Sequence, residues 1–507
     1  MKKNIGRSTL TVIFSALFVG QTIFADVWPG YHNTQQRTGL STNYGPDCCS
    51  TACDIDIQFS LASPVIDGAN QKVYMQGAVG PSGPWNLWCI DANNCSIKWT
   101  YLLSDSMPTN GLIIHSSCAI YGDSLIYVGS PADSTFYCID SSGAYKWKYK
   151  TGDRIRPSPA VSSDGSVIYT MSDDGYLYAI NSDSTLKWKT LTTASSSKYS
   201  SPTLSPDDST VYVGSYNNKL YAIKADSGSI KWSYVTGDEV RTSPAIGIYT
   251  DTATLITDTI IYVTSYTGRL YAVKQDGILK WSRVLGGNAN SSPALDVGRG
   301  MIYIGSDSTT NNRLNALNMS DGTIKWRMAL AGGSRYSSPA IASPNNLIYI
   351  GDASNTINII ANWVDSGVMV CQKTYDWPIT SPVIGADTSI WFNGYSYLHK
   401  IKCWAAPSSI EENKLDFKIN SGKNWPNPFS TKTRISFALP EKSFVNLDIY
   451  DITGKLVKTL SGNYASGQHS IIWDAKDNRS NKIKTGIYLC RLKTNSYSVT
   501  RKITVIK

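Results

Sequence analysis

Short runs of β-branched and aromatic residues recur along most of the chain, and polar turn residues separate them. "VYVGS" at 211–215 is apolar almost throughout, and runs of the type "LYAI", at 177–180 and 220–223, follow such segments after a turn of Asp, Asn or Gly. A run of the type "IKW" then closes most repeats. Four runs of this kind predict one four-stranded antiparallel sheet per repeat. Because the middle runs do not alternate with polar residues, we expect both of their faces to be buried.

A Ser-Pro or Ser-Cys pair opens each repeat, and alignment on these pairs defines eight repeats. The pairs lie 41 to 54 residues apart and begin at Ser63, Ser117, Ser158, Ser201, Ser243, Ser292, Ser338 and Ser381. This period with four strands is typical of a propeller blade, whereas a stacked solenoid is the alternative. Equivalent tryptophans, expected to pack against the next blade, are Trp99, Trp147, Trp188, Trp232, Trp281 and Trp326.

The eighth repeat lacks a closing "IKW" run of its own. The segment "IQF" at 57–59 precedes the first repeat, and we expect it to take that place. Such pairing would fasten the two ends of the ring together and remove two open sheet edges. The sequence therefore predicts an all-β fold: an eight-bladed β-propeller closed by an N-terminal strand, followed by a small Ig-like β-sandwich.

The repeats resemble those of the pyrroloquinoline-quinone (PQQ)-like propeller family, whose blades read SPA…VYVGS…DG…LYALD…G…W. The segment "WPGYHNTQQRTGLS" at 28–41 also resembles the opening motif of that family. The resemblance covers most of residues 26–404 and implies a PQQ-like propeller. Functions in the family range from quinone dehydrogenases to a non-enzymatic outer-membrane assembly factor.

The composition changes near residue 405. Residues 405–422 form a polar linker, and alternating runs such as "RISFAL" and "IYLCRL" in 423–507 predict a small β-sandwich. "NPF", "IYDITGKLV" and "TGIYLCRL" resemble the C-terminal sorting domain of type IX (Por) secretion, which shares its pattern with an Ig-like domain. The resemblance implies that the type IX secretion machinery is a partner. An Ig-like spacer without a sorting role is the alternative.

The first residues have the pattern of a secretory signal peptide. Lys2, Lys3 and Arg7 precede an apolar run that ends near residue 25. The run is shorter than the roughly 20 residues that span a bilayer, although a membrane anchor is the alternative. We expect residues 1–25 to be removed, the mature chain to lack a transmembrane segment, and a bacterial protein that is secreted or held at the outer cell surface.

The net charge of +9 is concentrated outside the predicted propeller. Residues 411–507 hold 17 Lys and Arg against 8 Asp and Glu, whereas residues 26–410 hold 27 against 30. Because the propeller is nearly neutral, we do not expect a general phosphate-binding surface, and no nucleic-acid partner is predicted.

The ten cysteines are compatible with export into an oxidising space. Cys48, Cys49 and Cys53 lie close together, which favours loop disulfides over the alternative of a zinc site. Cys89 and Cys95 flank a short turn and could form a bridge across a hairpin. The sequence leaves the remaining pairing open.

Motifs for catalysis are missing from the sequence. It contains no H-E-x-x-H, G-x-S-x-G, Walker or EF-hand pattern, and its four histidines are scattered. The adjacent Cys48 and Cys49 precede the first blade, whereas quinone enzymes place such a pair after it, so PQQ with calcium is not expected. Residues 173–175 could hold calcium, but Asp-Asp-Gly is also what a tight turn requires, which we favour. No catalytic, cofactor or metal residue is predicted.

Binding is the favoured function. In a propeller, the connections between blades open onto the mouth of the central channel, where cationic and aromatic side chains can bind an anionic or carbohydrate ligand. The expected ligand-binding residues are His115, Arg156, Tyr199, Arg241, Asn290 and Tyr336 from these connections, and Trp85, Tyr216, Tyr266, Arg269 and Arg313 from neighbouring turns. Ordinary polar rim chemistry is the alternative.

The sequence thus predicts a secreted or cell-surface binding or scaffold protein without enzymatic activity. Its propeller would present a site for a glycan, cell-wall or protein partner. The alternative is an enzyme, either a quinone-type oxidoreductase or a glycan-active propeller. Ligand identity, cleavage of the tail, oligomeric state and disulfide connectivity stay open at this level.

Overall fold

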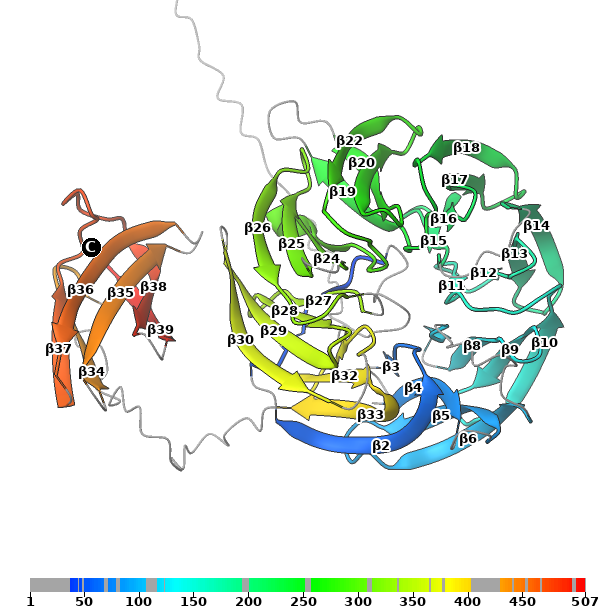
Figure 1. Cartoon of the computed structure of the whole chain (residues 1–507), viewed down its shortest axis with the longest axis horizontal. Coiled ribbons are helices and arrows are strands. Elements are labelled where there is room, and N and C mark those ends of the chain that lie inside the picture. The colour runs from blue at the N-terminus through cyan, green and yellow to red at the C-terminus, as the bar shows by residue number, and fades with distance from the viewer. Residues whose placement is uncertain are drawn as a thin grey trace, which may run out of the picture. The chain divides into compact units, whose positions relative to one another are not determined.

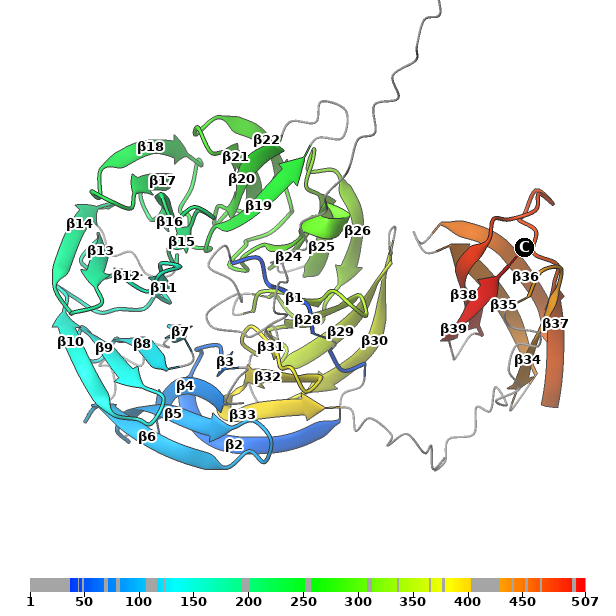
Figure 2. The same ribbon diagram turned by 180° about the vertical axis from the view of Figure 1, so that it is seen from behind.

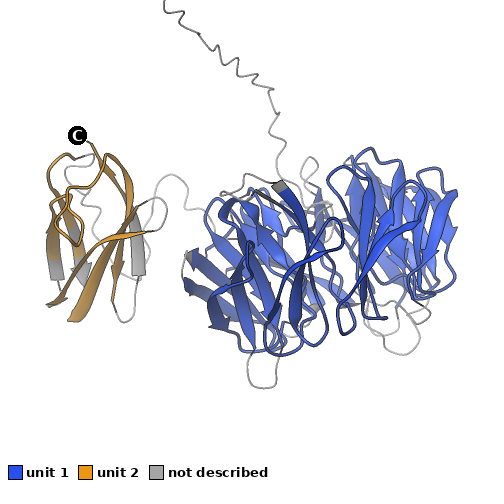
Figure 3. Cartoon of the chain, turned by 90° about the horizontal axis from the view of Figure 1, so that it is seen from above, with its two compact units in different colours: residues 1–403 blue, residues 404–507 orange. Residues whose placement is uncertain are grey.

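The computed structural model describes residues 37–43, 45–47, 50–67, 72–78, 83–105, 116–122, 124–193, 200–250, 257–307, 312–334, 337–363, 366–375, 379–402, 429–439, 442–451, 455–465, 467–494 and 498–506. The expected signal peptide and linker lie outside these residues. The chain divides into two compact units, residues 1–403 and 404–507 (Figure 3), which we call the N-terminal and C-terminal bodies. Where described, both consist of β-strands, apart from one short 3-10 helix, η1 (Val297–Arg299).

The repeats of the N-terminal body form antiparallel four-stranded meanders around a common centre, with the first strand of each innermost (Figures 1 and 2). Repeats 1 to 4 contain β3 (Val65–Asp67), β4 (Lys72–Ala78), β5 (Trp85–Asp91), β6 (Ile97–Ser104), β7 (Ala119–Tyr121), β8 (Leu125–Ser130), β9 (Thr135–Asp140), β10 (Tyr145–Lys150), β11 (Ala160–Val161), β12 (Val167–Met171), β13 (Tyr176–Asn181), β14 (Leu186–Leu191), β15 (Thr203–Leu204), β16 (Thr210–Ser215), β17 (Lys219–Lys224) and β18 (Ile230–Val235).

The later repeats have the same strand order. Repeats 5 to 8 contain β19 (Ala245–Thr250), β20 (Thr257–Thr264), β21 (Arg269–Lys274), β22 (Leu279–Val284), β23 (Ala294–Asp296), β24 (Met301–Ser306), β25 (Arg313–Asn318), β26 (Ile324–Ala329), β27 (Ala340–Ala342), β28 (Leu347–Gly351), β29 (Thr356–Trp363), β30 (Ser366–Thr374), β31 (Val383–Ile384), β32 (Ser389–Asn393) and β33 (Tyr395–Lys402).

The repeated tryptophan packs against the following sheet in repeats 1, 3, 4, 5 and 6, as the sequence predicts, whereas repeat 7 has Cys371 in this place. Trp188 of β14 lies opposite Ala179 of β13, and the tryptophans of repeats 1, 2, 4, 5 and 6 hold the same register. The indole of Trp188 covers Gly228 in repeat 4, where an added Cβ would lie 2.7 Å from its carbons. The indole N–H donates to the Ala225 carbonyl at 3.0 Å. Gly228 has a φ of 72°, a conformation that glycine adopts without strain.

The serines that open the repeats form a chain of hydrogen bonds around the ring. The backbone N–H of each serine donates to the side-chain oxygen of the serine in the following repeat, for example from Ser158 to Ser201 at 3.0 Å. Seven such bonds, each 2.8 to 3.0 Å long, connect the eight serines from Ser63 to Ser381. The Ser-Pro register therefore marks a physical contact between neighbouring sheets.

The N-terminal strand β2 (Thr51–Ser60) completes the sheet of repeat 8 by pairing with β33. The predicted register is wrong, because Cys53, and not the segment 57–59, lies opposite Lys400 in the place that tryptophan has in other repeats. Beyond an irregularity after Asp56, β2 meets β4 of repeat 1 at a single pair of residues. Ile57 is fully buried there, so this part of β2 belongs to the core between the two repeats.

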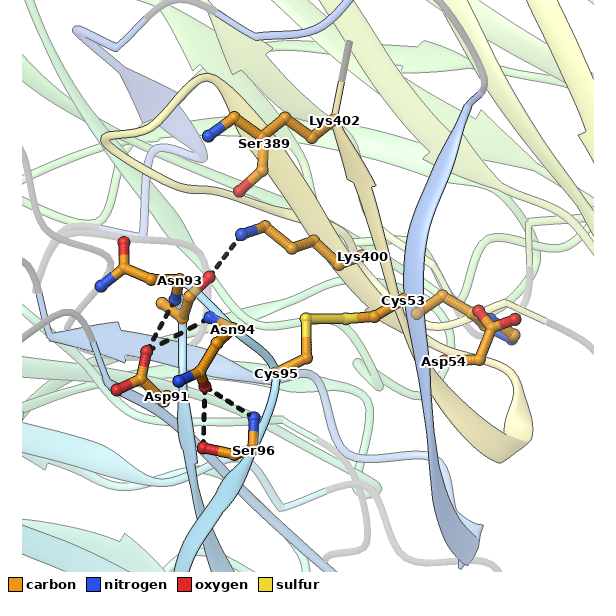
Figure 4. The surroundings of a disulfide bond; sticks show 12 residues. Cys53, Asp54, Asp91, Asn93, Asn94, Cys95, Ser96, Ser389, Lys400 and Lys402 are labelled. Atoms are coloured by element: carbon orange, nitrogen blue, oxygen red, sulfur yellow. Dashed lines mark hydrogen bonds and ion pairs between the residues drawn. A yellow bond between two sulfur atoms is a disulfide. The ribbon is translucent and has the colours of Figure 1, made fainter. Parts of the chain in front are cut away.

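A disulfide joins β2 to the β5–β6 turn of repeat 1 (Figure 4). It links Cys53 to Cys95, whose Cα atoms lie 6.5 Å apart, so the predicted bridge between Cys89 and Cys95 is wrong. Cys89 is a buried free thiol in the core between repeats 1 and 2, whereas Cys95 packs against the core shared with repeat 8. Cys371 is also disulfide-bonded. Cys48 and Cys49 lie outside the described residues.

The C-terminal body contains two sheets that share a core. One pairs β34 (Thr433–Leu439) with β37 (Gly467–Trp473), and the other has the order β36 (Leu456–Tyr464), β35 (Ser443–Asp451), β38 (Gly486–Lys493) and β39 (Ser498–Val505). Alternate residues of these strands pack around Trp473 and Phe429, whose ring centroids lie 5.5 Å apart. Single-faced burial explains the alternating pattern of this part of the sequence.

Candidate functional site

Two kinds of loop share one face of the N-terminal body, as predicted. The connection from the fourth strand of one repeat to the first strand of the next is hydrogen-bonded to the turn between strands two and three. Examples are the backbone bonds from Asp173 to Arg154 at 2.8 Å and from Tyr266 to Glu239 at 2.7 Å. We call this side of the ring the connection face. The predicted site residues that lie close together in the described part of the chain are on this face.

The Arg241 cluster consists of Tyr216, Glu239, Arg241 and Tyr266. The guanidinium carbon of Arg241 lies 3.7 Å from the ring centroid of Tyr266 and 5.3 Å from that of Tyr216, which belongs to the preceding repeat. Nε and Nη2 of Arg241 bind the same oxygen of Glu239, at 2.8 and 2.7 Å. The predicted residues Arg241, Tyr216 and Tyr266 are therefore neighbours, although the sequence did not point to Glu239.

The Arg241 cluster is charged, rigid and accessible. The side chains of Arg241 and Glu239 are 25% and 31% exposed, so a ligand can reach both of them. Burial lowers the pKa of Arg241, but the hydrogen bond with Glu239 and the neighbouring tyrosines outweigh this effect and leave the pKa raised. The guanidinium therefore stays charged and is held in place by its aromatic neighbours.

Arg156 occupies the equivalent position in repeat 3 but has a different environment. It forms an ion pair with Asp173 at 3.0 Å, and the two side chains are only 5% and 4% exposed. Asp173 stands in the turn position that Tyr266 has in repeat 5. Because the pair is closed off from solvent, Arg156 is not available to a ligand. Residues 173–175 form the tight turn that we favoured, with a φ of 87° at Gly175.

The other candidate residues are dispersed. Trp85 is fully buried, and its indole N–H donates to Gln76, so it belongs to the core and cannot stack on a ligand. Arg269 is exposed but donates to Ser282 on the outer strand β22. Asn290 and Arg313 are half-buried in other repeats. The remaining candidates, His115, Tyr199 and Tyr336, lie outside the described residues.

Sequence reasoning missed the segment that occupies the centre of the ring. The strand β1 (Leu40–Ser41) pairs in parallel with β27, the innermost strand of repeat 7 (Figure 2). Just before it, Arg37 is 2% exposed and donates to the carbonyls of Ser158, Pro159 and Pro202 in repeats 3 and 4, at 2.8 to 3.2 Å. The segment therefore spans the ring. Its sequence signal was the resemblance of residues 28–41 to a family opening motif.

The acidic, histidine and cysteine side chains of the described residues were the candidates for a metal centre. No group of three or more His, Cys, Asp or Glu side chains among them is arranged to hold a metal ion. His399 lies 2.7 Å from Asp54 at the boundary of β33 and β2, and His469 lies 2.7 Å from a backbone carbonyl of the C-terminal body. In the described part of the chain, no helix has the length and hydropathy needed to cross a membrane.

Comparisons with known proteins agree with this architecture. A family profile described as outer membrane protein assembly factor BamB matches residues 86–254 and 248–362, and a profile described as secretion system C-terminal sorting domain matches residues 423–507. No curated protein matches the chain.

Several solved structures are similar in fold. BamB from Moraxella catarrhalis has a TM-score of 0.53 at 15% identity, covering 69% of this chain and 99% of that one. A europium-containing methanol dehydrogenase has a TM-score of 0.58 at 12% identity, covering 73% and 89%. The quinohemoprotein alcohol dehydrogenase from Comamonas testosteroni has a TM-score of 0.57 at 12% identity, covering 74% and 80%. Identities this low establish a shared fold and no shared activity. Because the repeat profile matches more than half of the chain, the protein belongs to the PQQ-like repeat family described as outer membrane protein assembly factor BamB, and it ends in a secretion sorting domain.

Proposed function

We propose that this chain is an exported binding protein without enzymatic activity. Its residues 26–404 form an eight-bladed propeller, and residues 423–507 form an Ig-like sorting domain. The chain of hydrogen bonds between eight repeat-opening serines supports the blade count. The two sheets around one core support the Ig-like sandwich. The sorting domain indicates export to the cell surface or the medium.

The observation that carries the binding role is the half-exposed Arg241 between two tyrosines on the connection face. Glu239 already balances the charge of Arg241, so the cluster suits a neutral glycan better than a simple anion. Sugar hydroxyls can accept hydrogen bonds from the guanidinium and donate them to the carboxylate. The tyrosine rings provide apolar faces for the sugar ring. A glycan of a cell surface or cell wall is therefore the proposed partner.

The quinone-type alternative does not fit the ring centre. The quinone enzymes that the repeats resemble hold their cofactor above this centre, between a metal ion with acidic ligands and an aromatic ring. In this chain, Arg37 is hydrogen-bonded to innermost carbonyls of repeats 3 and 4 and brings a positive charge to the ring centre, which disfavours a metal cation there. The residues present do not fit PQQ with calcium, and we derive no step through that cofactor.

The binding role is tested with an array of neutral glycans and cell-wall fragments, using the full chain. Arg241→Gln is compared with Arg269→Gln, which makes the same charge change in the same repeat. We expect Arg241→Gln to weaken binding by roughly 2 kcal/mol, about thirtyfold, as for a central contact residue. Arg269→Gln should bind like the unsubstituted chain. Equal affinities of all three proteins would place the site elsewhere.

The sorting role has a separate test. Type IX secretion requires its C-terminal domain as an address, so a chain that ends at residue 422 should fold but stay inside the cell envelope. Cell fractionation compares this truncated chain with the full one. Equal amounts of the two in the medium and on the surface would show that residues 423–507 are a spacer.

A further inference from the structure

The outer side of repeats 2 and 3 concentrates positive charge. The outer strand β10 contributes Lys146, Lys148 and Lys150, and β14 contributes Lys187 and Lys189. All five side chains are exposed, and neither strand contains Asp or Glu. Lysine on an edge strand also prevents unwanted strand pairing, but that role alone predicts an even distribution. The outer strands β6 and β18 contain one lysine each, and β22 and β26 contain one lysine and one arginine each, so β10 with its three lysines is the most basic of these strands.

Aromatic side chains lie between these lysines at the boundary of repeats 2 and 3. Tyr149 of β10 packs against Tyr178 of β13, with ring centroids 6.1 Å apart, and Tyr176 lies 6.3 Å from Tyr178. The ammonium nitrogen of Lys189 lies 4.6 Å from the centroid of Tyr176 and 5.6 Å from that of Tyr178.

A related arrangement occurs one repeat earlier, where Thr135 stands in the place of Tyr176. Tyr101 of β6 packs against Tyr137 of β9, with centroids 6.2 Å apart, and Lys148 of β10 lies opposite Tyr137 in the register. We call each group, Tyr101 with Tyr137 and Lys148, or Tyr149 with Tyr178 and Lys189, a Tyr-Tyr-Lys set. The two sets lie at successive boundaries, one between repeats 1 and 2 and the other between repeats 2 and 3, whose outer strands β6, β10 and β14 follow one another around the ring (Figure 1).

The carboxylates of Asp133 and Asp174 lie at the end of the two sets that is nearest the connection face. The hydroxyls of Tyr137 and Tyr178 donate to Asp133 and Asp174, which belong to turns of the connection face. Asp140 of β9 also forms an ion pair with Lys146 at 2.9 Å, so Lys148, Lys150, Lys187 and Lys189 carry the positive charge of this surface. Repeat 5 contains the two tyrosines of such a set, Tyr234 and Tyr271, but Ser282 stands in the place of the lysine. The complete set is thus a feature of repeats 2 and 3, and the fold does not require it.

We propose that the two Tyr-Tyr-Lys sets are adjacent subsites for an acidic polysaccharide, bearing carboxylate or sulfate groups. The lysines supply charge for the acidic groups, and the half-buried tyrosines Tyr101 and Tyr149 supply apolar faces for sugar rings. Two equivalent subsites in successive repeats fit a polymer better than a single small anion, because both can be occupied by one chain. Clustered lysines of this kind also occur in heparin-binding patches. The proposal does not depend on the Arg241 cluster, which lies in repeats 4 and 5.

The test measures binding of the full chain to polygalacturonate and to heparin, with dextran as the uncharged probe and single-stranded DNA as a second polyanion. The pair Lys148→Gln and Lys189→Gln removes one lysine from each set. The pair Lys231→Gln and Lys325→Gln makes the same charge change on the outer strands β18 and β26. We expect the double variant with Lys148→Gln and Lys189→Gln to lose at least tenfold in affinity for one acidic polysaccharide. The double variant with Lys231→Gln and Lys325→Gln should lose less than twofold.

Three outcomes would overturn the proposal. Equal losses in both pairs would mean that net charge alone decides binding. Equal affinity for DNA, with the same response to the substitutions, would make the surface a general polyanion site. If the chain bound neither polygalacturonate nor heparin, acidic polysaccharides would be excluded as the partner. A selective loss in the first pair, with weak DNA binding, supports the two subsites.

Discussion

The disulfide between Cys53 and Cys95 stands where repeats 1, 3, 4, 5 and 6 have a tryptophan packed on the turn of the next repeat. Cys53 lies opposite Lys400 as Trp188 lies opposite Ala179. Cys95, with a φ of 62°, holds the left-handed turn position of the glycine under the indole. The ammonium group of Lys400 donates to the Ala92 carbonyl, the equivalent of the carbonyl that binds the indole N–H. Three residues thus replace one tryptophan contact, and we predict that the disulfide is a main source of stability at this boundary.

The magnitude follows from the length of the loop that the disulfide closes. The two cysteines are 42 residues apart in sequence. Loop-closure entropy for this length gives about 4 kcal/mol of stabilisation at 25 °C. With an unfolding entropy of about 2 cal/mol/K per residue, a body of this size should lose about 5 °C in melting temperature when the bond is removed.

The assay is calorimetry, which monitors thermal unfolding of the full chain for Cys53→Ser, Cys95→Ser and the double variant. Each single variant should be as unstable as the double one, because either substitution removes the whole bond. A second comparison uses Cys53→Trp with Cys95→Gly and Lys400→Ala, which restores the tryptophan contact of the other boundaries. Burial of the indole should recover roughly 2 kcal/mol of the loss. A fall of less than 1 °C in the double variant, or additive losses in the single ones, would refute the reasoning.

Three further predictions concern residues whose roles the structure defines. Arg156→Ala leaves the carboxylate of Asp173 without its guanidinium in a buried site, so we expect a loss of about 3–5 kcal/mol in the free energy of unfolding, and replacing both residues by Ala should restore part of it in a denaturant titration. Ser201→Ala removes one acceptor from the serine chain and should cost about 1–3 kcal/mol, visible as a lower denaturant midpoint without a change in slope. Hydrogen bonds from turn serines lower the pKa of Asp164 to about 2, so its contribution to stability should be present above pH 4 and lost as the pH falls toward 2. Asp164→Asn should weaken this acid dependence, and an unchanged profile would contradict the assignment.

The sequence predicted contacts that recur, because the same physical demand repeats in every sheet. The tryptophan, the serine and the apolar middle strands keep one register through most repeats, so each confirms the others. The last boundary escaped prediction because its contact is built differently. The segment "IQF" at 57–59 has the composition of the closing run of a repeat. In the pairing of β2 with β33, however, Cys53 lies in the place of the tryptophan.

The candidate site could be predicted only in part, for a related reason. Arg156 and Arg241 hold the same place before their Ser-Pro pairs, but a single turn residue decides their environment. Asp173 buries the first arginine as an ion pair, and Tyr266 leaves the second accessible. Trp85 has the composition of a binding residue, yet it begins a strand whose interior face covers it. Arg37 acts through carbonyls more than a hundred positions away, which no local pattern encodes.

The long-range contacts of the first described residues also determine the order in which the N-terminal body folds. Gly45 and Pro46 are hydrogen-bonded to Asn345 and Tyr349, about 300 positions later, and β2 pairs with a strand still further along. Contacts of this separation form slowly because a long loop must close first. The part of the chain that is synthesised early is therefore among the last to reach its partners. The ring can therefore be completed only after the eighth repeat has been synthesised.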